Sequence, residues 1–214
     1  REGITKVTKA QITAARENGY VIKLLAIAER IDADGSGEQG VSARVYPALV
    51  PREHPLAAVR GAFNAVFVEA EAAGSLMFYG AGAGGVQTAS AVLGDLVSAA
   101  KRHVAGGPGL ADSVHANLEV LPIERIYTRY QITIQAKDQP GVLAQIANIF
   151  ADHGVSVETV EQSVNPSEPG KTPTASLMVG THEATDASLS SVVNSLAASE
   201  AVESITSVIR VEGL

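Results

Sequence analysis

The chain has 214 residues, of which 46% are hydrophobic, 18% are charged and only 4% are aromatic. This composition fits one large or two ordinary globular domains, and it excludes a disordered chain and a collagen-like repeat. The sequence contains no cysteine, which excludes disulfides, thiolate nucleophiles and cysteine-ligated metal ions. No apolar run approaches the roughly 20 residues that span a bilayer, and no secretory leader is recognisable. We therefore expect a cytoplasmic protein with no membrane partner.

The net charge of −7 is unevenly distributed along the chain. Residues 1–123 carry 11 Lys/Arg against 12 Asp/Glu, whereas residues 124–214 carry 5 against 11. An acidic surface repels phosphate backbones, so we expect no nucleic-acid partner. The change in charge indicates a domain boundary near the middle of the chain. The first residue is Arg1 rather than Met, from which we expect a piece of a longer protein.

The first half predicts a mixed α+β segment. Thr8 and Gln11 form the pattern of a capping box at the start of a helix, and Gly19 is placed to end that helix. Apolar and β-branched runs predict strands at 20–29, 41–49, 64–70 and 75–79, the first two joined as a hairpin by a turn at 32–37. A helix is expected from about 86 to 103, and the Gly/Pro-rich residues 105–111 after it indicate a hinge or linker.

The second half predicts a β-α-β-β-α-β order, the split βαβ sandwich. Residues 130–136 alternate apolar and polar side chains as a half-buried strand does. Further strands are expected at 155–162, 175–180 and 202–211, with a polar loop at 165–173. Asp186 is expected to cap the second helix. The apolar helix positions are Val142, Leu143, Ile146, Ile149 and Phe150 in the first helix, and Leu189, Val192, Val193 and Leu196 in the second.

A glycine-rich segment, Gly80 to Gly85, lies between an expected strand and an expected helix. Glycines in this context let the backbone approach a phosphate or a nicotinamide ring closely. Positions 80, 82 and 85 fit the GxGxxG spacing, but no further strand follows His103 as a self-contained dinucleotide-binding unit requires. From the pattern alone, glycines that serve packing or a tight turn remain the more frequent alternative.

The segment Asp138 to Leu143 is a second candidate site. Pro140 suits a first helical turn, and Gly141 leaves the backbone uncovered. A helix N-terminus offers N–H donors to a ligand carboxylate, and Asp138 is placed to pair with an ammonium group. Together these features suit a zwitterionic amino acid. The alternative is that Asp138 only caps the helix.

The remaining polar patterns predict neither catalytic nor metal-binding residues. The acidic turn with Asp32, Asp34 and Ser36 lacks the Glu of a calcium loop. No serine sits in a nucleophile elbow, and no paired carboxylates stand out. The histidines show no metal-ligand spacing and are expected at the surface or at helix ends; they are His54, His103, His115, His153 and His182.

Several blocks of residues 1–104 resemble the C-terminal two-thirds of bacterial homoserine dehydrogenases. The blocks are 2–5, 19–28, 45–50, 54–57, 63–66, 77–85 and 88–95. Residues 127–214, in which Asp138-x-Pro-Gly-Val-Leu143 opens the first helix, resemble an ACT domain, the regulatory module often found at the C-terminus of that family. The resemblance implies an α+β fold, with a mixed-sheet substrate/dimerisation domain (1–104), a linker (105–126) and a ferredoxin-like βαββαβ ACT domain (127–214).

The resemblance also implies an activity and a cofactor. The family interconverts L-aspartate 4-semialdehyde and L-homoserine with NADPH or NADH, on the route to threonine, methionine and isoleucine. By this resemblance Gly84 contacts the nicotinamide cofactor, NADP or NAD, and Gly82, Ala83 and Thr88 lie close by. Gln87 stands where the family usually has proline.

For the ACT domain, the resemblance implies an effector site and a partner copy. Asp138, Gly141, Val142 and Leu143 supply one side of the site, and residues 155–158 of a second copy supply the other. L-threonine is the expected effector, and the expected assembly is a homo-oligomer, at least a dimer.

The other catalytic features of the family precede the residues matched here. They are a first glycine fingerprint, a sodium-binding loop, acidic substrate ligands and a catalytic lysine. Lys6, Lys9 and Lys23 do not match that lysine, because two flank a helix start and the third lies in a strand. We therefore expect this chain to be inactive alone, and its independent activity to be amino-acid sensing and oligomerisation.

Overall fold

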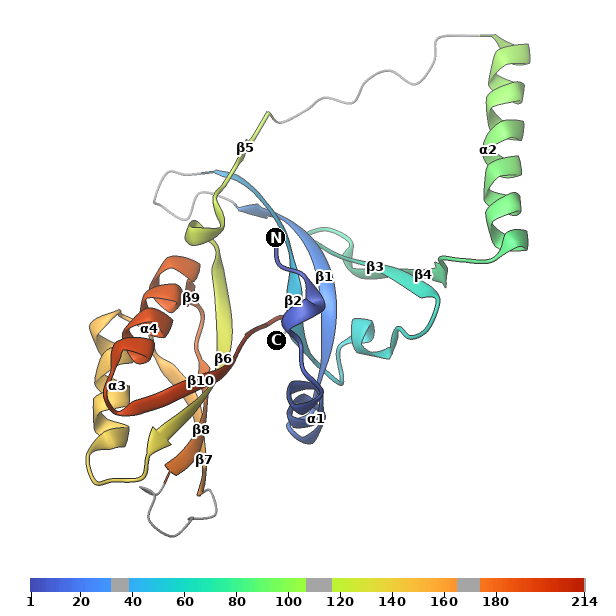
Figure 1. Ribbon diagram of the computed structural model, residues 1–214. Helices are drawn as coiled ribbons and strands as arrows, with labels where there is room; N and C mark the ends of the chain where they lie inside the picture. Colours follow the sequence, from blue (N-terminus) through green and yellow to red (C-terminus); the bar gives the residue numbers. More distant parts are fainter. Residues whose placement is uncertain (32–38, 107–116, 165–173, 214) are drawn as a thin grey trace. The chain divides into compact units, whose positions relative to one another are not determined.

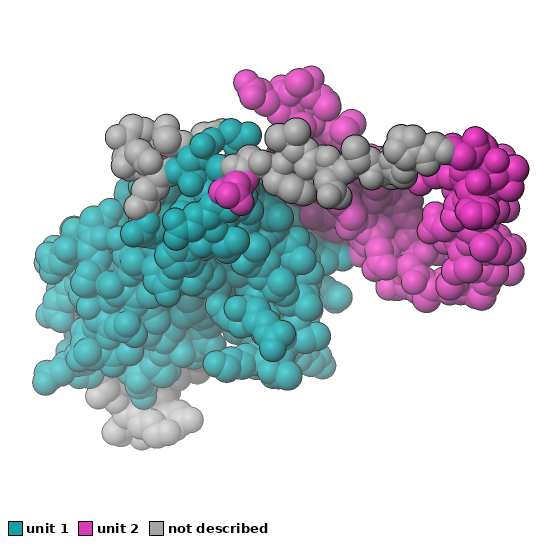
Figure 2. Space-filling model, turned by 90° about the horizontal axis from the view of Figure 1, so that it is seen from above, with its two compact units in different colours: residues 1–52, 118–214 teal, residues 53–117 magenta. Residues whose placement is uncertain are grey.

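The computed structural model describes residues 1–31, 39–106, 117–164 and 174–213. Two compact units are present (Figure 2): residues 1–52 together with 118–214, and residues 53–117. Three expected features lie outside the described residues, namely the turn at 32–37, the loop at 165–173 and the central part of the expected linker. His115 lies outside them as well.

The first unit begins with a short 3-10 helix, η1 (Ile4–Lys6), and helix α1 (Lys9–Glu17). The predicted capping box is confirmed: the backbone N–H of Gln11 donates to the Thr8 hydroxyl (3.2 Å), and the backbone N–H of Thr8 donates to the Gln11 side chain (2.8 Å). Gly19 follows the helix with a φ of +81°, a conformation that favours glycine. Strands β1 (Tyr20–Ile31) and β2 (Gly40–Pro51) then pair antiparallel as the predicted hairpin.

The C-terminal residues form the predicted β-α-β-β-α-β module (Figure 1). Its elements are β6 (Tyr127–Lys137), α3 (Val142–Asp152), β7 (Val157–Val164), β8 (Thr174–Thr181), α4 (Asp186–Ala198) and β10 (Val202–Val211). Short elements precede and interrupt the module: β5 (Glu119–Val120), η3 (Ile123–Arg125) and β9 (Ala184–Thr185). Helices α3 and α4 lie together on one face of its sheet (Figure 1).

One expected detail of this module is wrong. Asp186 does not cap α4; Thr185 is the N-cap, and its hydroxyl accepts the backbone N–H of Ser188 (3.2 Å). Asp186 is the first helical residue, and it is 5% exposed. A buried carboxylate needs ionic or hydrogen-bonding partners, and Asp186 has them in Tyr130 and Arg210.

The hairpin and the C-terminal module share one sheet, with the strand order β1-β2-β10-β6-β8-β7. The junction is the parallel pairing of β10 with β2, in which Arg210 lies opposite Ala48 and Val211 lies opposite Leu49. The backbone N–H of Glu212 extends it by donating to the Leu49 carbonyl (3.0 Å). Strand β5 pairs with the other end of β2. Residues far apart in the sequence therefore form a continuous backbone hydrogen-bonding network.

The two faces of this sheet have separate cores. Helices α3 and α4 cover one face; the fully buried residues there include Ile132, Ile134, Ile146, Phe150, Leu189 and Leu196. On the other face, Ala15 of α1 packs against Leu49 of β2 and Ile209 of β10. The Gln11 side chain adds a hydrogen bond to Ser207 of β10 (2.9 Å). Helix α1 thus covers the place where the hairpin meets the C-terminal module.

The second unit contains η2 (Pro55–Ala58), strands β3 (Phe63–Ala70) and β4 (Gly74–Ala81), and helix α2 (Gly85–Ala105). The two strands predicted here are confirmed, and β3 and β4 pair antiparallel along their whole length. Gly74 turns the chain between them with a φ of +67°. Many apolar side chains of this unit are exposed, including Phe63, Val66, Phe78, Leu93 and Leu96. In the described part of the chain, no helix is long and apolar enough to cross a bilayer.

Candidate nicotinamide and effector sites

The glycine-rich segment connects β4 directly to α2. Gly80 and Ala81 end the strand, and Gly85 is the first residue of the helix. The backbone N–H of Gly82 donates to the Ala62 carbonyl (2.9 Å), and that of Thr88 donates to the Gly84 carbonyl (3.0 Å). The whole segment is exposed. The structure therefore presents these residues as an open backbone edge followed by a helix start.

One of these glycines is required by the backbone conformation. Gly84, the N-cap of α2, has a φ of +132°, which favours glycine. A Cβ on Gly82 would meet only the end of the Asn64 side chain. The structure therefore confirms a tight-turn role for Gly84. Gly80 and Gly85 are different, because among the described residues nothing lies within 4 Å of a Cβ added to either.

The segment fits one wall of a nicotinamide nucleotide site. No side chain in the described part of the chain caps the start of α2, so the backbone N–H groups of its first turn are available to a negatively charged group. Ala83 and Thr88 are exposed beside it. A small residue and a hydroxyl next to an open backbone suit close approach by a planar ring. One wall does not make an enclosed site.

The second candidate segment opens helix α3. Gly141 is its N-cap with a φ of +89°, and within the described residues no side chain caps this helix start. The interpretation of Asp138 as the helix cap is therefore wrong, and this carboxylate is exposed. Val142 is 8% exposed and belongs to the core, whereas Leu143 is 48% exposed. The backbone, Asp138 and Leu143 thus face outward, while Val142 only anchors the helix.

The strand assigned to a partner copy lies at the end of the sheet. Strand β7 pairs with β8 on one side and is the last strand in the sheet order. Val155, just before it, is 3% exposed and packs in the core. Glu158 is exposed and accepts from Arg129 of β6 (3.1 Å). An edge strand of this kind has backbone groups free to pair with another chain.

The lysines and histidines hold structural positions. Lys6 ends η1, Lys9 begins α1 and Lys23 lies within β1. The His54 ring caps η2 by accepting the backbone N–H of Leu56 (3.2 Å), and His153 shares a hydrogen bond with Ser195 (2.8 Å). Among the described residues, no group of three or more His, Asp or Glu side chains is arranged to hold a metal ion.

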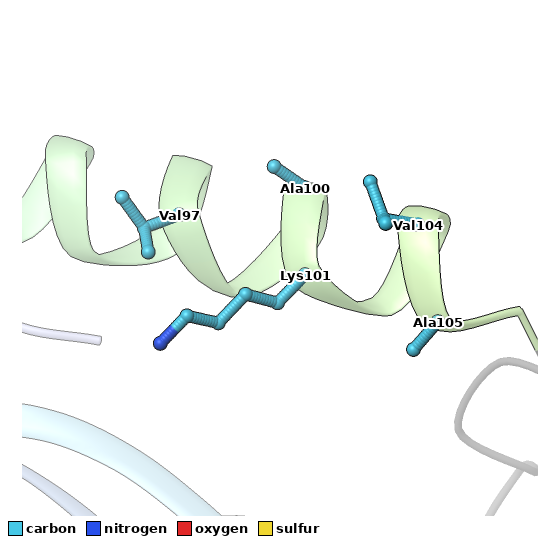
Figure 3. Close-up of a pocket in the computed structure, with 5 residues that line it drawn as sticks. All are labelled: Val97, Ala100, Lys101, Val104 and Ala105. Atoms are coloured by element: carbon cyan, nitrogen blue, oxygen red, sulfur yellow. The ribbon is translucent and has the colours of Figure 1, made fainter.

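A pocket on α2 contributes nothing to either candidate site. Figure 3 shows its lining: Val97, Ala100, Lys101, Val104 and Ala105, all from the last turns of that one helix. A surface formed by a single helix gives a ligand no opposing wall. None of the residues predicted to bind a cofactor or an effector lines it.

Sequence reasoning missed a cluster of buried polar side chains where β2 meets β10. Arg210 of β10 pairs with Asp186 of α4 (2.8 Å) and with Glu2 (2.6 Å). Burial by itself lowers the pKa of Arg210, but its hydrogen bond to Glu2 and the nearby Tyr130 and Asp186 raise that pKa overall. A signal was available in the sequence: an arginine within an apolar strand needs a partner, and both β2 and β10 contain one.

Comparison with known proteins agrees with this architecture. Residues 1–97 match the homoserine dehydrogenase family, and residues 130–201 match the ACT domain. The homoserine dehydrogenase of Mycobacterium tuberculosis is 55% identical over 213 residues, which are 100% of this chain and 48% of the relative. That of Corynebacterium glutamicum is 46% identical over 211 residues, 99% of this chain and 46% of the relative.

Solved structures agree as well. The crystal structure of a homoserine dehydrogenase from Thiobacillus denitrificans matches 98% of this chain and 46% of its own, with a TM-score of 0.83 and 33% identity. A Staphylococcus aureus homoserine dehydrogenase matches 99% of this chain and 47% of its own, with a TM-score of 0.56 and 27% identity.

The chain is therefore an α+β protein in which a region that matches homoserine dehydrogenases is joined to an ACT domain. Over residues 1–97 the chain belongs to the homoserine dehydrogenase family. It spans about half the length of the curated relatives that it matches.

Proposed function

We propose that this chain works as part of a homoserine dehydrogenase, which interconverts L-homoserine and L-aspartate 4-semialdehyde with NADP or NAD. This reaction belongs to the biosynthesis of threonine, methionine and isoleucine, and we place the protein in the cytoplasm. The observation that carries the proposal is the 55% identity to a homoserine dehydrogenase over the whole chain. An identity of this extent covers both the oxidoreductase region and the ACT domain.

In this proposal the glycine-rich segment holds one side of the cofactor. The bound nicotinamide supplies hydride transfer to and from the substrate carbon. The open backbone at Gly82 and Gly84 lets the ring approach closely, and Thr88 and Ala83 lie beside it.

We further propose that residues 1–214 alone do not turn over substrate. Hydride transfer requires cofactor, proton donor and substrate to be held together in one geometry. The described residues provide one open wall for the cofactor, and Lys6, Lys9 and Lys23 end η1, begin α1 and lie within β1. The remaining groups are therefore expected from the part of the relatives that this chain does not match.

A growth experiment tests the proposed function. The matched segment of the Mycobacterium tuberculosis homoserine dehydrogenase is replaced by this chain, and the joined gene is expressed in a bacterium lacking its own homoserine dehydrogenase. Growth without threonine and methionine is the expected result. The same strain carrying residues 1–214 alone is the matched control, and it is expected not to grow. Failure of the joined gene to restore growth, with the protein present and folded, contradicts the proposal.

A second function is proposed for the ACT domain: binding of an amino-acid effector, with L-threonine as the ligand. The uncapped start of α3 is placed to receive the ligand carboxylate, and the exposed Asp138 to receive its ammonium group. Residues 155–158 of a partner copy complete the site. An effector acts only if it binds two states with different affinity. Calorimetry with threonine, isoleucine and methionine tests this: heat with threonine supports it, and no heat with any at millimolar concentration contradicts it.

Self-association is part of the same proposal. The exposed apolar side chains Val66, Leu76 and Phe78 share one face of the paired strands β3 and β4 and form a surface that a lone chain leaves in water. We expect at least a homodimer. Light scattering coupled to size-exclusion chromatography measures the mass directly, and a mass of one chain contradicts the expectation.

A further inference from the structure

A polar network with a buried centre lies where the hairpin β1–β2 meets the ACT domain, and it draws its members from both. The hairpin side supplies Glu29, Arg44 and Tyr46, together with Glu2 at the chain start; the ACT side supplies Tyr130, Asp186, Arg210 and Glu212. We call these eight residues the junction network. Arg44 and Tyr46 are two apart on β2, as are Arg210 and Glu212 along the chain at β10, so each pair shares one face of the sheet.

Arg210 is the centre of the network. Its Nε and Nη2 atoms both donate to Oδ1 of Asp186 (3.1 and 2.8 Å), and its Nη1 atom donates to Glu2 (2.6 Å). The guanidinium carbon lies 4.5 Å from the ring centroid of Tyr46 and 5.3 Å from that of Tyr130. One side chain therefore contacts α4, β6, β2 and the chain start simultaneously.

A second branch of the network runs along β2. The Tyr46 hydroxyl donates to Glu212 and accepts from Nε of Arg44 (2.9 Å). Arg44 then reaches Glu29 of β1 (2.7 Å). Hydrogen bonds thus extend from the end of β10 across β2 to the edge strand of the sheet.

The network specifies a single orientation of the two parts. Apolar surfaces tolerate small shifts, but buried charges must keep their partners at hydrogen-bond distance and angle. The Arg210 side chain is only 11% exposed, and a shift of β10 against β2 would separate its guanidinium from the Tyr46 ring and Glu212 from the Tyr46 hydroxyl. The backbone pairing of β10 with β2 is short, covering Arg210 and Val211. The side chains of the junction network therefore contribute much of what fixes the orientation of the ACT domain against the hairpin.

We propose that the junction network locks the ACT domain to the hairpin, and that Arg210 transmits movement of the ACT domain to β2. Strand β2 ends at Pro51, and the second compact unit begins at residue 53. A displacement of α4 moves Asp186. Arg210 moves with Asp186 because the two side chains are paired, and the contact between Arg210 and the Tyr46 ring passes the movement to β2. The locking stands on the geometry alone, whereas the transmission of an effector signal rests on the proposed function of the ACT domain.

Hydrogen exchange of the full 214-residue chain tests the locking. Arg210→Met removes the ion pairs but keeps an unbranched apolar stem. The matched control is Arg129→Met, which breaks the exposed pair with Glu158 inside the ACT sheet and leaves the junction intact. We expect amides of residues 41–51 and 202–213 to exchange more than about tenfold faster in Arg210→Met, while α3 exchanges as in the unchanged chain.

A milder variant keeps the test decisive if Arg210→Met does not fold. Tyr46→Phe retains the ring that Arg210 contacts and removes only the hydroxyl shared by Arg44 and Glu212. It is expected to increase exchange in the same two segments by a smaller factor. Each of Arg210→Met and Tyr46→Phe that folds is compared with the Arg129→Met control. If the exchange rates of residues 41–51 and 202–213 equal those of the control, the locking is overturned.

The transmission is tested in the joined enzyme of the growth experiment. L-threonine is titrated calorimetrically and against activity. In Arg210→Met the dissociation constant for L-threonine is expected to stay within about twofold of that of the unchanged joined enzyme. The threonine concentration that inhibits activity by half is expected to rise by about tenfold or more. Unchanged inhibition overturns the transmission. If the joined enzyme with Arg210 in place binds no threonine, the proposed effector and the transmission both fail, and the exchange experiment still decides on the locking.

Discussion

The Nε and Nη2 atoms of Arg210 donate to the same carboxylate oxygen of Asp186, at 3.1 and 2.8 Å. Arg210 lies in the last strand and Asp186 is the first residue of α4. The neighbouring Thr185 performs the capping that the sequence had suggested for Asp186. Two adjacent residues thus have different tasks, one local to the helix and one across the sheet.

This division predicts unequal costs for two neighbouring alanine variants. Thr185→Ala removes a helix cap, which lowers the free energy of unfolding by about 1 kcal/mol. Asp186→Ala leaves the buried Arg210 without its principal partner, which lowers the free energy of unfolding by about 3 to 5 kcal/mol. Urea unfolding of both variants measures the difference. Equal losses would show that Asp186 is no more than a helix-end residue.

The partly buried carboxyl group of Glu212 predicts that the free energy of unfolding depends on pH. Burial raises the pKa of Glu212 above the ordinary glutamate value of 4.5, and Glu29 adds to this, while the Tyr46 hydrogen bond, Arg44 and Arg210 lower it. The folded state therefore binds this proton more tightly than the unfolded state. Its stabilising contribution is complete below pH 4.5 and is lost as the pH rises through the raised pKa.

The variant Glu212→Gln is expected to remove that dependence while keeping an oxygen for the Tyr46 hydroxyl. Its free energy of unfolding at pH 7 is predicted to equal or exceed that of the unchanged chain, and to fall less between pH 4.5 and 7. Urea midpoints across this range provide the measurement. An unaltered pH profile in the variant would exclude Glu212 as its source.

The buried phenol of Tyr130 predicts a second pH dependence of stability, in the alkaline range. Burial raises the pKa of the Tyr130 phenol to about 12, and the hydrogen-bonded Asp186 adds to this against the opposing Arg210. Because the pKa in the folded state exceeds the ordinary tyrosine value of 10.0, stability is lost as the pH rises from 10 through 12. In Tyr130→Phe the phenolate absorbance near pH 12 should decrease and the alkaline loss of stability should be smaller. A phenolate titration identical to that of the unchanged chain would refute this.

The left-handed backbone conformation of Gly141 predicts that a side chain at this position lowers stability through backbone strain alone. Its φ is +89°, and among the described residues nothing lies within 4 Å of an added Cβ. Gly141→Ala should therefore reduce the free energy of unfolding by about 1 to 2 kcal/mol without a steric clash. Gly141→Asn is the matched control, since asparagine tolerates left-handed conformations better. The order Gly, then Asn, then Ala in thermal stability is expected, and an alanine variant as stable as glycine would contradict it.

Local features of this fold follow from the sequence. The Thr8–Gln11 capping box is set by residues three apart, and the repeat of Val142, Ile146 and Phe150 is set by the helical period; the structure confirms both. Leu143 shows the limit of the period, because it lies in the same apolar series and is nonetheless 48% exposed.

The junction between β10 and β2 is not predictable in this way. Arg210 and Ala48 are distant in the sequence, and no local pattern selects β2 as the neighbour of β10. The glycine-rich segment is an intermediate case: its place between β4 and α2 is confirmed. The cofactor role of Gly84 follows from the family resemblance and stays a prediction.

The activity of the joined enzyme tests the central claim most directly. The purified protein, in which this chain replaces the matched segment of the Mycobacterium tuberculosis relative, is assayed for reduction of NADP or NAD with L-homoserine. We predict homoserine-dependent formation of the reduced cofactor by the joined protein, and none by residues 1–214 alone. A folded joined protein without this activity, or turnover by the 214 residues alone, would contradict the account.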